Sequence, residues 1–455
     1  MTKKRFVSAT MAAIFAASLV AGCGNGGGNN SSTTTAAKKS DGKVLNIYCW
    51  NDEFKQRYEK YYKNTPSDVK VNWVITPNDN NGYQNALDAA LKKQDSAPAD
   101  EKIDIFLIEA DYALKYTDTE YALDVKNDIG LTDDDLKDQY SYTKEIVTST
   151  DGKLKGVTWQ ATPGLFAYRR SIAKDVLGTD DPTEVQKALA DWNKFNDVAK
   201  QASAKGYKML SGYDDSYRTF SNNVSKPWVD AKTSKIQIDD NLMKWVDQTK
   251  TFTDEGYNNK TSLWSDGWNA DQGSKGKVFG FFYSTWGINF TLLGNSLDKK
   301  EADGGKAEVG NGIFGDYAVC QGPQPYYWGG TWICAAKGTD NVDLVKDIMK
   351  TLTCDKTTMK QITTDTQDYT NTTSGMNEIA NSDFKSDFLG GQNHIKLFAE
   401  VAPKINMKNM SSYDQGLNEE FQKAFKDYFD GKVTKDQALE NFYKAALEKY
   451  PNLKK

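Results

Sequence analysis

Residues 43–50 read KVLNIYCW, an alternating and then continuous apolar run that is typical of a buried strand. The pattern continues with helical spacing over 52–64, a second strand over 69–76, a second helix over 83–94 and a third strand, IDIFLIEA, over 103–110. Strands that alternate with helices predict a mainly parallel sheet with right-handed crossovers. We therefore expect an α/β fold.

The carboxyl ends of these strands carry polar and aromatic side chains. Trp50, Asn51 and Asp52 follow the first strand, and Glu109 and Asp111 follow the third. Ligands of open α/β sheets bind at the edge where the parallel strands end. Topology alone therefore places a candidate site at these residues.

The chain begins with a segment that predicts export. Three basic residues precede an uncharged, mostly apolar run over 6–20, which is too short to span a bilayer comfortably. The stretch LVAGC that follows resembles the lipobox of bacterial lipoproteins, which implies cleavage before Cys23 and lipid attachment to that cysteine. An ordinary signal peptide with an incidental cysteine is the alternative. We expect a signal peptide over 1–22 and a flexible, lipid-anchored linker, rich in Gly, Asn, Ser and Thr, over 23–42.

Composition excludes several classes of protein. The net charge is −5 and no basic patch occurs, which argues against nucleic acid and anionic lipid as partners. Beyond the leader no apolar stretch is long enough for a membrane span. The 455 residues exceed the length at which one core stops growing, so two domains are expected.

The titratable residues give little support for catalysis or metal binding. His394 is the only histidine, so a Ser-His-Asp or Cys-His enzyme would have to use it, and a multi-histidine metal site is excluded. No calcium loop, P-loop or GxGxxG occurs, and we expect no metal and no cofactor. Four cysteines match no zinc spacing and predict buried or idle thiols, with a Cys320–Cys334 bridge left open; they are Cys49, Cys320, Cys334 and Cys354.

The remaining segments combine strands with aromatic residues in polar, Gly-rich surroundings. A Gly-flanked strand is predicted over 152–159, a strand that ends in an aromatic loop over 276–288, and a glycine-broken strand over 325–338. The acidic run over 132–138 predicts a helix start. Residues 418–450 predict two amphipathic helices divided at Gly431.

Taken in order, these segments resemble the carbohydrate-type extracellular solute-binding proteins of ATP-binding-cassette importers, the family that includes maltose-binding protein. The resemblance covers nearly all of 43–450 and rests on the lipobox with its linker and on seven stretches: LNIYCWNDEF, DIFLIEADYALKYTDTEYALDV, GVTWQATPGLFAYRR, DWNKFNDVAKQ, GKVFGFFYSTW, YYWGGTWICAAKGTDN and GKVTKDQALENFYKAALEKY. Ser171 departs from the family, which often has an acidic residue there, and 207–229 reads as an elaborated loop.

The resemblance implies a two-lobe, type II periplasmic-binding-protein-like fold with a hinge and an interlobe cleft. The chain would cross between lobes near 156–158, 321–325 and 360–368. These crossings predict an N-lobe of 43–156 plus 326–365 and a C-lobe of 157–325 plus 366–455. The resemblance also implies a monomer at the cell surface, held to the outer face of the cytoplasmic membrane by lipid on Cys23, that delivers its ligand to a membrane permease.

The residue types suit a sugar. Aromatic rings cover the C–H faces of a pyranose, at on the order of 1 kcal/mol each, while carboxylates and amides bind its hydroxyls. The stacking candidates are Trp50, Trp286 and Trp332, and the polar candidates are Asp52, Glu109, Asp111 and Gln160. By resemblance, Glu109, Asp111 and Trp286 lie on segments that line family clefts. Tyr283 and Tyr413 are weaker candidates, Tyr413 because its helix start resembles one that carries a cleft-lining aromatic.

Two other functions remain open. The same fold could bind a peptide, a polyamine or a phosphate-bearing solute, although no arginine cluster favours phosphate. A secreted glycoside-processing enzyme would use two carboxylates, and acidic residues are plentiful. No catalytic motif stands out, so we expect a binding protein, not an enzyme, with a carbohydrate, most simply an oligosaccharide, as its ligand.

Overall fold

The structure, a computed structural model, describes residues 43–455. Its N-terminal part has the predicted alternation: β1 (Val44–Cys49), α1 (Glu53–Tyr61), β2 (Lys70–Ile75), α2 (Gly82–Leu91) and β3 (Ile105–Glu109). Strand β1 pairs in parallel with β2 on one side and with β3 on the other. The carboxyl ends of the three strands therefore lie at one edge, as predicted.

Two later strands complete this first sheet. Strand β10 (Thr331–Ala335) runs antiparallel to β3, and β4 (Val157–Thr158) runs antiparallel to β10, giving the order β2-β1-β3-β10-β4. The strand predicted over 325–338 is confirmed only in its second half. Gly329 and Gly330 have φ of +76° and +104°, a conformation that interrupts the strand, and a Cβ at Gly329 would lie 2.8 Å from Nε1 of Trp286.

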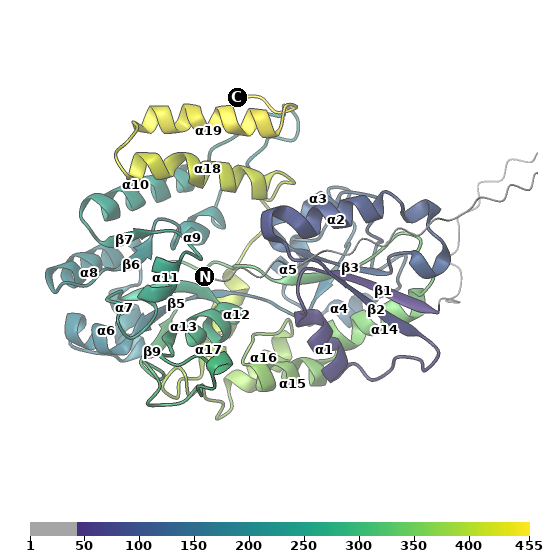
Figure 1. The fold of residues 1–455 in the computed structure, drawn as a ribbon, viewed down its shortest axis with the longest axis horizontal. Coiled ribbons are helices and arrows are strands. Elements are labelled where there is room, and N and C mark those ends of the chain that lie inside the picture. The colour runs from purple at the N-terminus through teal and green to yellow at the C-terminus, as the bar shows by residue number, and fades with distance from the viewer. Residues whose placement is uncertain (1–42) are drawn as a thin grey trace, which may run out of the picture. The chain divides into compact units, whose positions relative to one another are not determined.

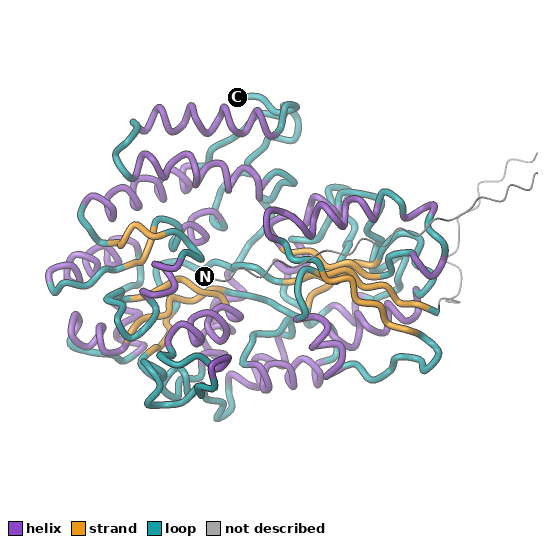
Figure 2. Tube along the Cα trace, in the orientation of Figure 1, coloured by secondary structure: helices purple, strands orange, loops and turns teal. Residues whose placement is uncertain are grey.

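The second group of strands is antiparallel. Strand β5 (Gly164–Arg169) pairs with β8 (Gly280–Ser284) and with β9 (Tyr317–Cys320). A short parallel pair, β6 (Leu210–Gly212) and β7 (Asn258–Thr261), lies beside them. The chain passes from the first sheet to the second between β4 and β5 and returns between β9 and β10. Figure 2 shows the strands of the two groups apart from each other.

Helices fill the connections of both groups. On the first-sheet side they are α3 (Ala113–Thr117), α4 (Asp133–Leu136), α5 (Ser141–Glu145), α14 (Val342–Thr353) and α15 (Lys356–Thr366). On the second-sheet side they are α6 (Arg170–Leu177), α7 (Pro182–Ala188), α8 (Trp192–Ala204), α9 (Tyr217–Ser221), α10 (Asp240–Asp254), α11 (Asp266–Asp271), α16 (Thr373–Ala380) and α17 (His394–Val401). Helix α4 begins at Thr132 with a capping box to Asp135, which confirms the predicted helix start.

The segment after β8 is helical, so the prediction of an aromatic loop there was wrong. It contains α12 (Thr285–Gly287), a π-helix over Ile288–Leu292 and α13 (Leu293–Ser296). Because this turn starts directly at the end of β8, it presents Trp286 and Phe290 from consecutive helical turns. A π-helical turn is rare and often marks a functional position.

The last two helices are α18 (Asp414–Phe429) and α19 (Lys435–Lys449). Helix α18 ends before Gly431 and α19 begins after it, as predicted. They pack on each other, and α18 also packs on α10 (Figure 1). A separate hydrophobic core that includes Trp245, Phe421 and Phe442 joins them. This addition extends the second-sheet side.

Several predictions concern residues outside the described range or groups that the fold buries. The signal peptide, the linker and Cys23 lie outside residues 43–455. Within that range no helix is long and apolar enough to cross a membrane. Cys49, Cys320 and Cys334 are buried free thiols and Cys354 is a half-buried one, so the open Cys320–Cys334 bridge is not formed.

Candidate ligand-binding site

A cavity of about 700 Å³ lies where β1 and β3 end, and residues of both sheets line it. First-sheet elements contribute most of its polar groups, and the second-sheet side contributes Trp264, Trp286 and Phe290, half of its aromatic residues. The lining residues are Trp50, Asn51, Asp52, Glu53, Gln56, Asn78, Asp79, Glu109, Asp111, Tyr112, Gln160, Trp264, Trp286, Phe290, Trp328, Gly329, Gly330, Thr331 and Gln415. The predicted carboxyl-end site is therefore a real cavity.

Trp50 and Asp52 take their positions from the end of β1. Trp50 packs edge-on against Tyr83 and Tyr112, with ring centroids 5.6 and 6.5 Å away. Asp52 is the N-cap residue of α1, but its carboxylate makes no capping bond and instead accepts from Nε2 of Gln56 at 2.8 Å. Both residues are thus held by their neighbours and keep part of their surface on the cavity.

Glu109 and Asp111 lie together at the end of β3 and are joined by a hydrogen bond. The backbone N–H of Asp111 donates to Oε2 of Glu109 at 2.8 Å. Both oxygens of the Asp111 carboxylate accept from the guanidinium of Arg218, on α9. Burial, and next the charge of Asp111, raise the pKa of Glu109 to about 8. A carboxyl with that pKa can donate or accept a hydrogen bond near neutral pH.

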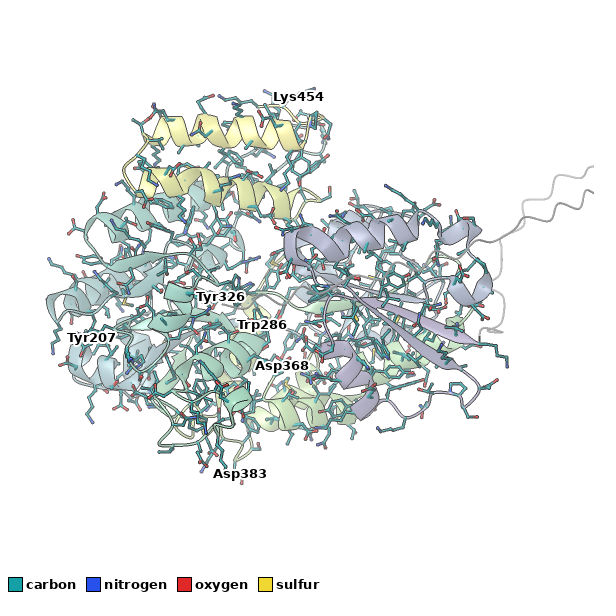
Figure 3. The ribbon with its side chains drawn as sticks, viewed as in Figure 1. Tyr207, Trp286, Tyr326, Asp368, Asp383 and Lys454 are labelled. Atoms are coloured by element: carbon teal, nitrogen blue, oxygen red, sulfur yellow. The ribbon has the colours of Figure 1, made fainter. Side chains whose placement is uncertain are left out.

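Gln160 occupies the segment that leaves the first sheet. Its Nε2 donates to Oε1 of Glu53 at 3.1 Å and to Oδ2 of Asp368 at 2.9 Å. Burial, and next the charge of Asp368, raise the pKa of Glu53 to about 7. Asp368 also accepts from Thr285, at the start of α12. Trp286 and Asp368 lie on the side of the second sheet that borders the first (Figure 3). This network ties the crossing segment to both walls of the cavity.

The opposite wall is a cluster of indole rings. Trp264 stacks on Trp286 with a 6.1 Å centroid distance and a 21° interplanar angle, and it contacts Trp328 at 5.8 Å. Nε1 of Trp286 donates to the carbonyl of Trp328 at 3.1 Å, which fixes the ring. Trp264 is 52% exposed and Phe290 59%, which is unusual for such large apolar side chains. The wall therefore offers open aromatic surface to a ligand.

Trp264 adopts a backbone conformation that a tryptophan rarely takes. Its φ is +67°, in the left-handed region. The ring of Trp268 supports it at 5.2 Å, and Nε1 of Trp268 donates to the buried Asp215 at 2.6 Å. A strained and exposed aromatic residue that is held by a buried polar contact is typical of a functional position.

Six of the nine predicted ligand-binding residues line this cavity: Trp50, Asp52, Glu109, Asp111, Gln160 and Trp286. The other three do not. Trp332 is 1% exposed, and its Nε1 donates to the carbonyl of Thr143 at 2.9 Å, because alternation along β10 puts Thr331 on the cavity and Trp332 into the core. Tyr283 is buried with its hydroxyl on Gln272, and Tyr413 packs against Tyr450.

The sequence prediction missed several lining residues. Trp264 stands in the polar stretch SLWSDGW and Trp328 precedes the two glycines, so both fit the criterion of an aromatic residue in polar, Gly-rich surroundings. Arg218 does not line the cavity itself but pairs with Asp111, which does. It lies in 207–229, which the sequence presented as an elaborated loop; that segment in fact contains β6 and α9. Glu53 carried no signal, since an acidic residue in a first helical turn is ordinary.

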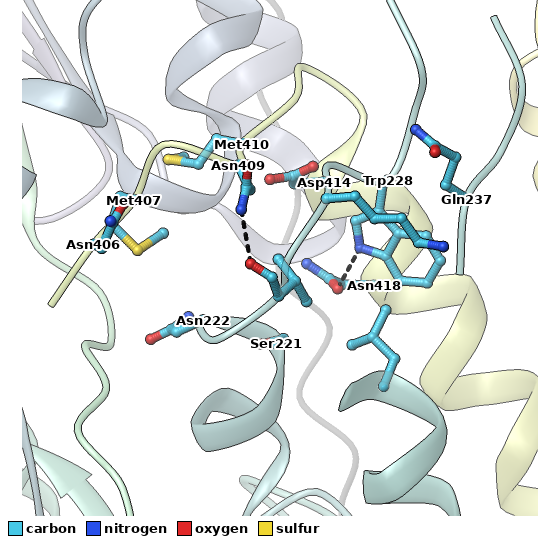
Figure 4. A pocket seen from close by; sticks show the side chains of 13 residues that line it. Ser221, Asn222, Trp228, Gln237, Asn406, Met407, Asn409, Met410, Asp414 and Asn418 are labelled. Carbon is cyan, nitrogen blue, oxygen red and sulfur yellow. Dashed lines mark hydrogen bonds between the residues drawn. The ribbon is translucent and has the colours of Figure 1, made fainter. Parts of the chain in front are cut away.

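Other features of the described residues fit a small-molecule site less well. A groove of about 640 Å³ beside β4 has no aromatic residue in its lining, which includes Lys153, Lys155 and Lys337. A cavity near α18 measures about 30 Å³, the space of one or two water molecules, and contains the hydrogen bond from Trp228 to Asn418 (Figure 4). Among residues 43–455 no group of His, Cys, Asp or Glu is arranged to hold a metal ion.

His394 is placed in the core. Its Nε2 lies 3.1 Å from the carbonyl of Gln367, and burial lowers its pKa to about 4. The ring is 0% exposed, at the start of α17, and does not line the cavity. A catalytic triad built on this histidine at the cavity therefore has no support in the fold.

Comparison with known proteins finds a family model and solved structures that match this chain. A family model described as bacterial extracellular solute-binding protein matches residues 54–388. No curated protein matches the sequence. A solved extracellular solute-binding protein of family 1 is 18% identical with a TM-score of 0.72, over 89% of this chain and 99% of its own.

Two further solved structures contain a bound sugar. The binding protein associated with an ABC transporter of B. animalis subsp. lactis Bl-04, in complex with beta-1,6-galactobiose, is 16% identical, with a TM-score of 0.64 over 90% of this chain and 98% of that one. The solute-binding protein of Staphylococcus aureus in complex with maltose is 18% identical, with a TM-score of 0.59 over 90% and 98%. Identities this low show the fold, and they confirm the predicted type II, maltose-binding-protein-like class.

Proposed function

Because the chain belongs to the family of bacterial extracellular solute-binding proteins, we propose that it captures a carbohydrate in the 700 Å³ cavity and delivers it to the permease of an ATP-binding-cassette importer. The observation that carries the proposal is the division of the cavity into two walls. Trp264, Trp286 and Trp328 form one wall, and carboxylates and amides stand opposite.

A sugar ring matches these two walls. Its C–H faces stack on indoles, and its hydroxyls form directional bonds with carboxylates and amides. Micromolar affinity requires about 8 kcal/mol, which several stacked rings and hydroxyl bonds can supply together. Trp264 extends the aromatic surface beyond Trp286, so we propose an oligosaccharide as the ligand. The bound galactobiose and maltose of the two similar structures support this class.

We further propose that ligand binding closes two lobes. The N-lobe is 43–156 plus 326–365, and the C-lobe is 157–325 plus 366–455. Contacts that form only when both walls touch the ligand would shift the population toward the closed state, which the permease reads. A lipid on Cys23 and the linker over 23–42 would keep a monomeric protein at the cell surface.

Calorimetric titration of the purified protein against mono- and oligosaccharides, peptides and polyamines tests the proposal. We expect micromolar binding of at least one oligosaccharide, and a loss of at least tenfold in the variant Trp286→Ala. The control is Val309→Ala, an exposed residue outside the cavity, which should bind as the wild type does. Binding of a peptide or polyamine with no response to any saccharide would overturn the choice of ligand, and glycan turnover would overturn the assignment as a binding protein.

A further inference from the structure

The charges of the cavity are one-sided. Five carboxyl side chains line it, and among the described lining residues there is no lysine, arginine or histidine. All five stand on first-sheet elements or the loops that follow them: Asp52, Glu53, Asp79, Glu109 and Asp111. An acidic wall thus faces the aromatic wall.

Two of the five carboxyl groups have a cationic partner within the protein. Asp111 is paired with Arg218, and Glu53 lies 3.5 Å from the guanidinium of Arg57. In residues 43–455, no ion pair forms at Asp52, Asp79 or Glu109. The carboxylates of Asp52 and Asp79 therefore carry uncompensated charge at the cavity, while Glu109, with a pKa raised to about 8, is mostly protonated near neutral pH.

Two of the side-chain amides that line the cavity are already engaged. The side-chain amides of Gln56 and Gln160 already donate to carboxylates. Two further polar atoms on lining residues are shielded from solvent and have no partner among the described residues: Oδ1 of Asn78 and the hydroxyl of Tyr112, whose residue is only 4% exposed. Because these two atoms are shielded, a ligand in the cavity does not reach them, and Asn51 and Gln415 contribute further side-chain amides to the lining. The preference of the wall therefore comes from its charge, which favours a positive group.

The aromatic wall has the same preference. Indole faces attract cations through their quadrupole. Trp264 and Trp286 present such faces opposite the carboxyl groups. A positive group would gain from both walls, whereas a uronate or a sulfated sugar would meet the negative charge of Asp52 and Asp79.

From this asymmetry we propose that the ligand is a basic saccharide, an amino sugar or an oligosaccharide of amino sugars, whose protonated amino group binds between the acidic and aromatic walls. The proposal rests on the proposed carbohydrate function and narrows its ligand class. An ammonium group supplies three donors and a positive charge, and among residues 43–455 neither Asp52 nor Asp79 has an ion-pair partner.

Matched saccharides test the proposal. Calorimetry at about pH 6, where amino groups of this kind are protonated, compares oligosaccharides of glucosamine with the same oligosaccharides N-acetylated, with neutral gluco-oligosaccharides, with oligouronates and with spermidine. We expect the free-amino form to bind at least tenfold more tightly than the N-acetylated form. That advantage should shrink as salt is raised from about 0.01 to about 1 M, because ionic contacts are screened.

Substitutions of the cavity carboxylates test whether they bind the amino group. Asp52→Asn and Asp79→Asn should each reduce the free-amino advantage, while Glu301→Gln, which removes an equal charge outside the cavity, should leave it unchanged. Equal or tighter binding of N-acetylated, neutral or uronate saccharides would overturn the basic-ligand proposal and leave the carbohydrate function standing. Binding of spermidine with no saccharide bound would overturn both.

Discussion

Arg218 binds both carboxylate oxygens of Asp111 and so joins the second-sheet side of the protein to the first-sheet side. Asp111 follows β3, Arg218 lies on α9, and each side chain is less than a quarter exposed. The pair lies beside the cavity, next to Glu109. It is therefore positioned to stabilise the arrangement in which the two walls face each other.

Replacing Arg218 tests this role. Arg218→Gln leaves the Asp111 charge partly buried without its partner, which costs about 1–2 kcal/mol, and we expect saccharide affinity to fall about 5–30-fold. Small-angle scattering of the unliganded variant should give a larger radius of gyration than the wild type. The double variant Asp111→Asn with Arg218→Gln removes the stranded charge and should recover part of the affinity. An unchanged radius and affinity would show that the pair has no part in closure.

Two substitutions of Trp264 should weaken binding equally but differ in their effect on stability. Trp264→Ala removes a stacking surface, and we expect affinity to fall by about 1–2 kcal/mol. Trp264→Gly should bind as weakly but be more stable than Trp264→Ala by about 1 kcal/mol, because glycine adopts φ of +67° without strain. Urea denaturation and calorimetry measure the two quantities. A less stable glycine variant would contradict the assignment of strain at this position.

Trp332 should behave as a core residue. Trp332→Ala leaves a cavity beside β10 and removes the bond to Thr143, so unfolding free energy should fall by about 3–5 kcal/mol. The milder Trp332→Phe should lose about 1 kcal/mol, the usual worth of one hydrogen bond, and keep wild-type affinity. If Trp332→Phe lost affinity as Trp286→Ala is expected to do, Trp332 would belong to the site after all.

The raised pKa of Glu109 predicts that the free energy of unfolding depends on pH. Burial and Asp111 raise its pKa to about 8 in the folded state, against an ordinary value near 4.3 in the unfolded chain. The folded state holds the proton more tightly, so stability is lost as the pH rises from about 4 through about 8. Glu109→Gln removes this loss. Its Tm without ligand should exceed that of the wild type at pH 8 and equal it near pH 4.

The matched control for this titration is Glu378→Gln. Lys356 and Lys360 lower the pKa of Glu378 to about 2, so the sign is opposite and no gain in Tm at pH 8 is expected. If the difference in Tm between Glu109→Gln and the wild type were the same at pH 4 and at pH 8, that result would contradict the raised pKa of Glu109.

The sequence predicted the first sheet because its information is local. Periodicity in 43–110 reported each strand and helix, and parallel topology then placed Trp50, Asp52, Glu109 and Asp111 at one edge. The aromatic wall depends on the backbone between elements. The turn after β8 is helical and Gly329–Gly330 end the strand early, so which of Trp328 and Trp332 reaches the cavity follows from register and not from composition.

The contacts of Arg218 and Trp264 could not be predicted for a related reason, although Trp264 fits the criterion of an aromatic residue in polar surroundings. Each acts through a partner distant in sequence, Asp111 for Arg218 and Trp286 for Trp264. A periodic pattern describes one element at a time and contains no information on which elements meet across a cavity. Long-range contacts of this kind become visible only in three dimensions.

A crystal structure of the protein with a bound oligosaccharide tests the central claim most directly. The account predicts sugar rings stacked on Trp286 and Trp264, with hydroxyl or amino groups on Asp52 and Glu109. A saccharide bound instead in the groove beside Lys153 and Lys337, with the indole wall empty, would contradict it.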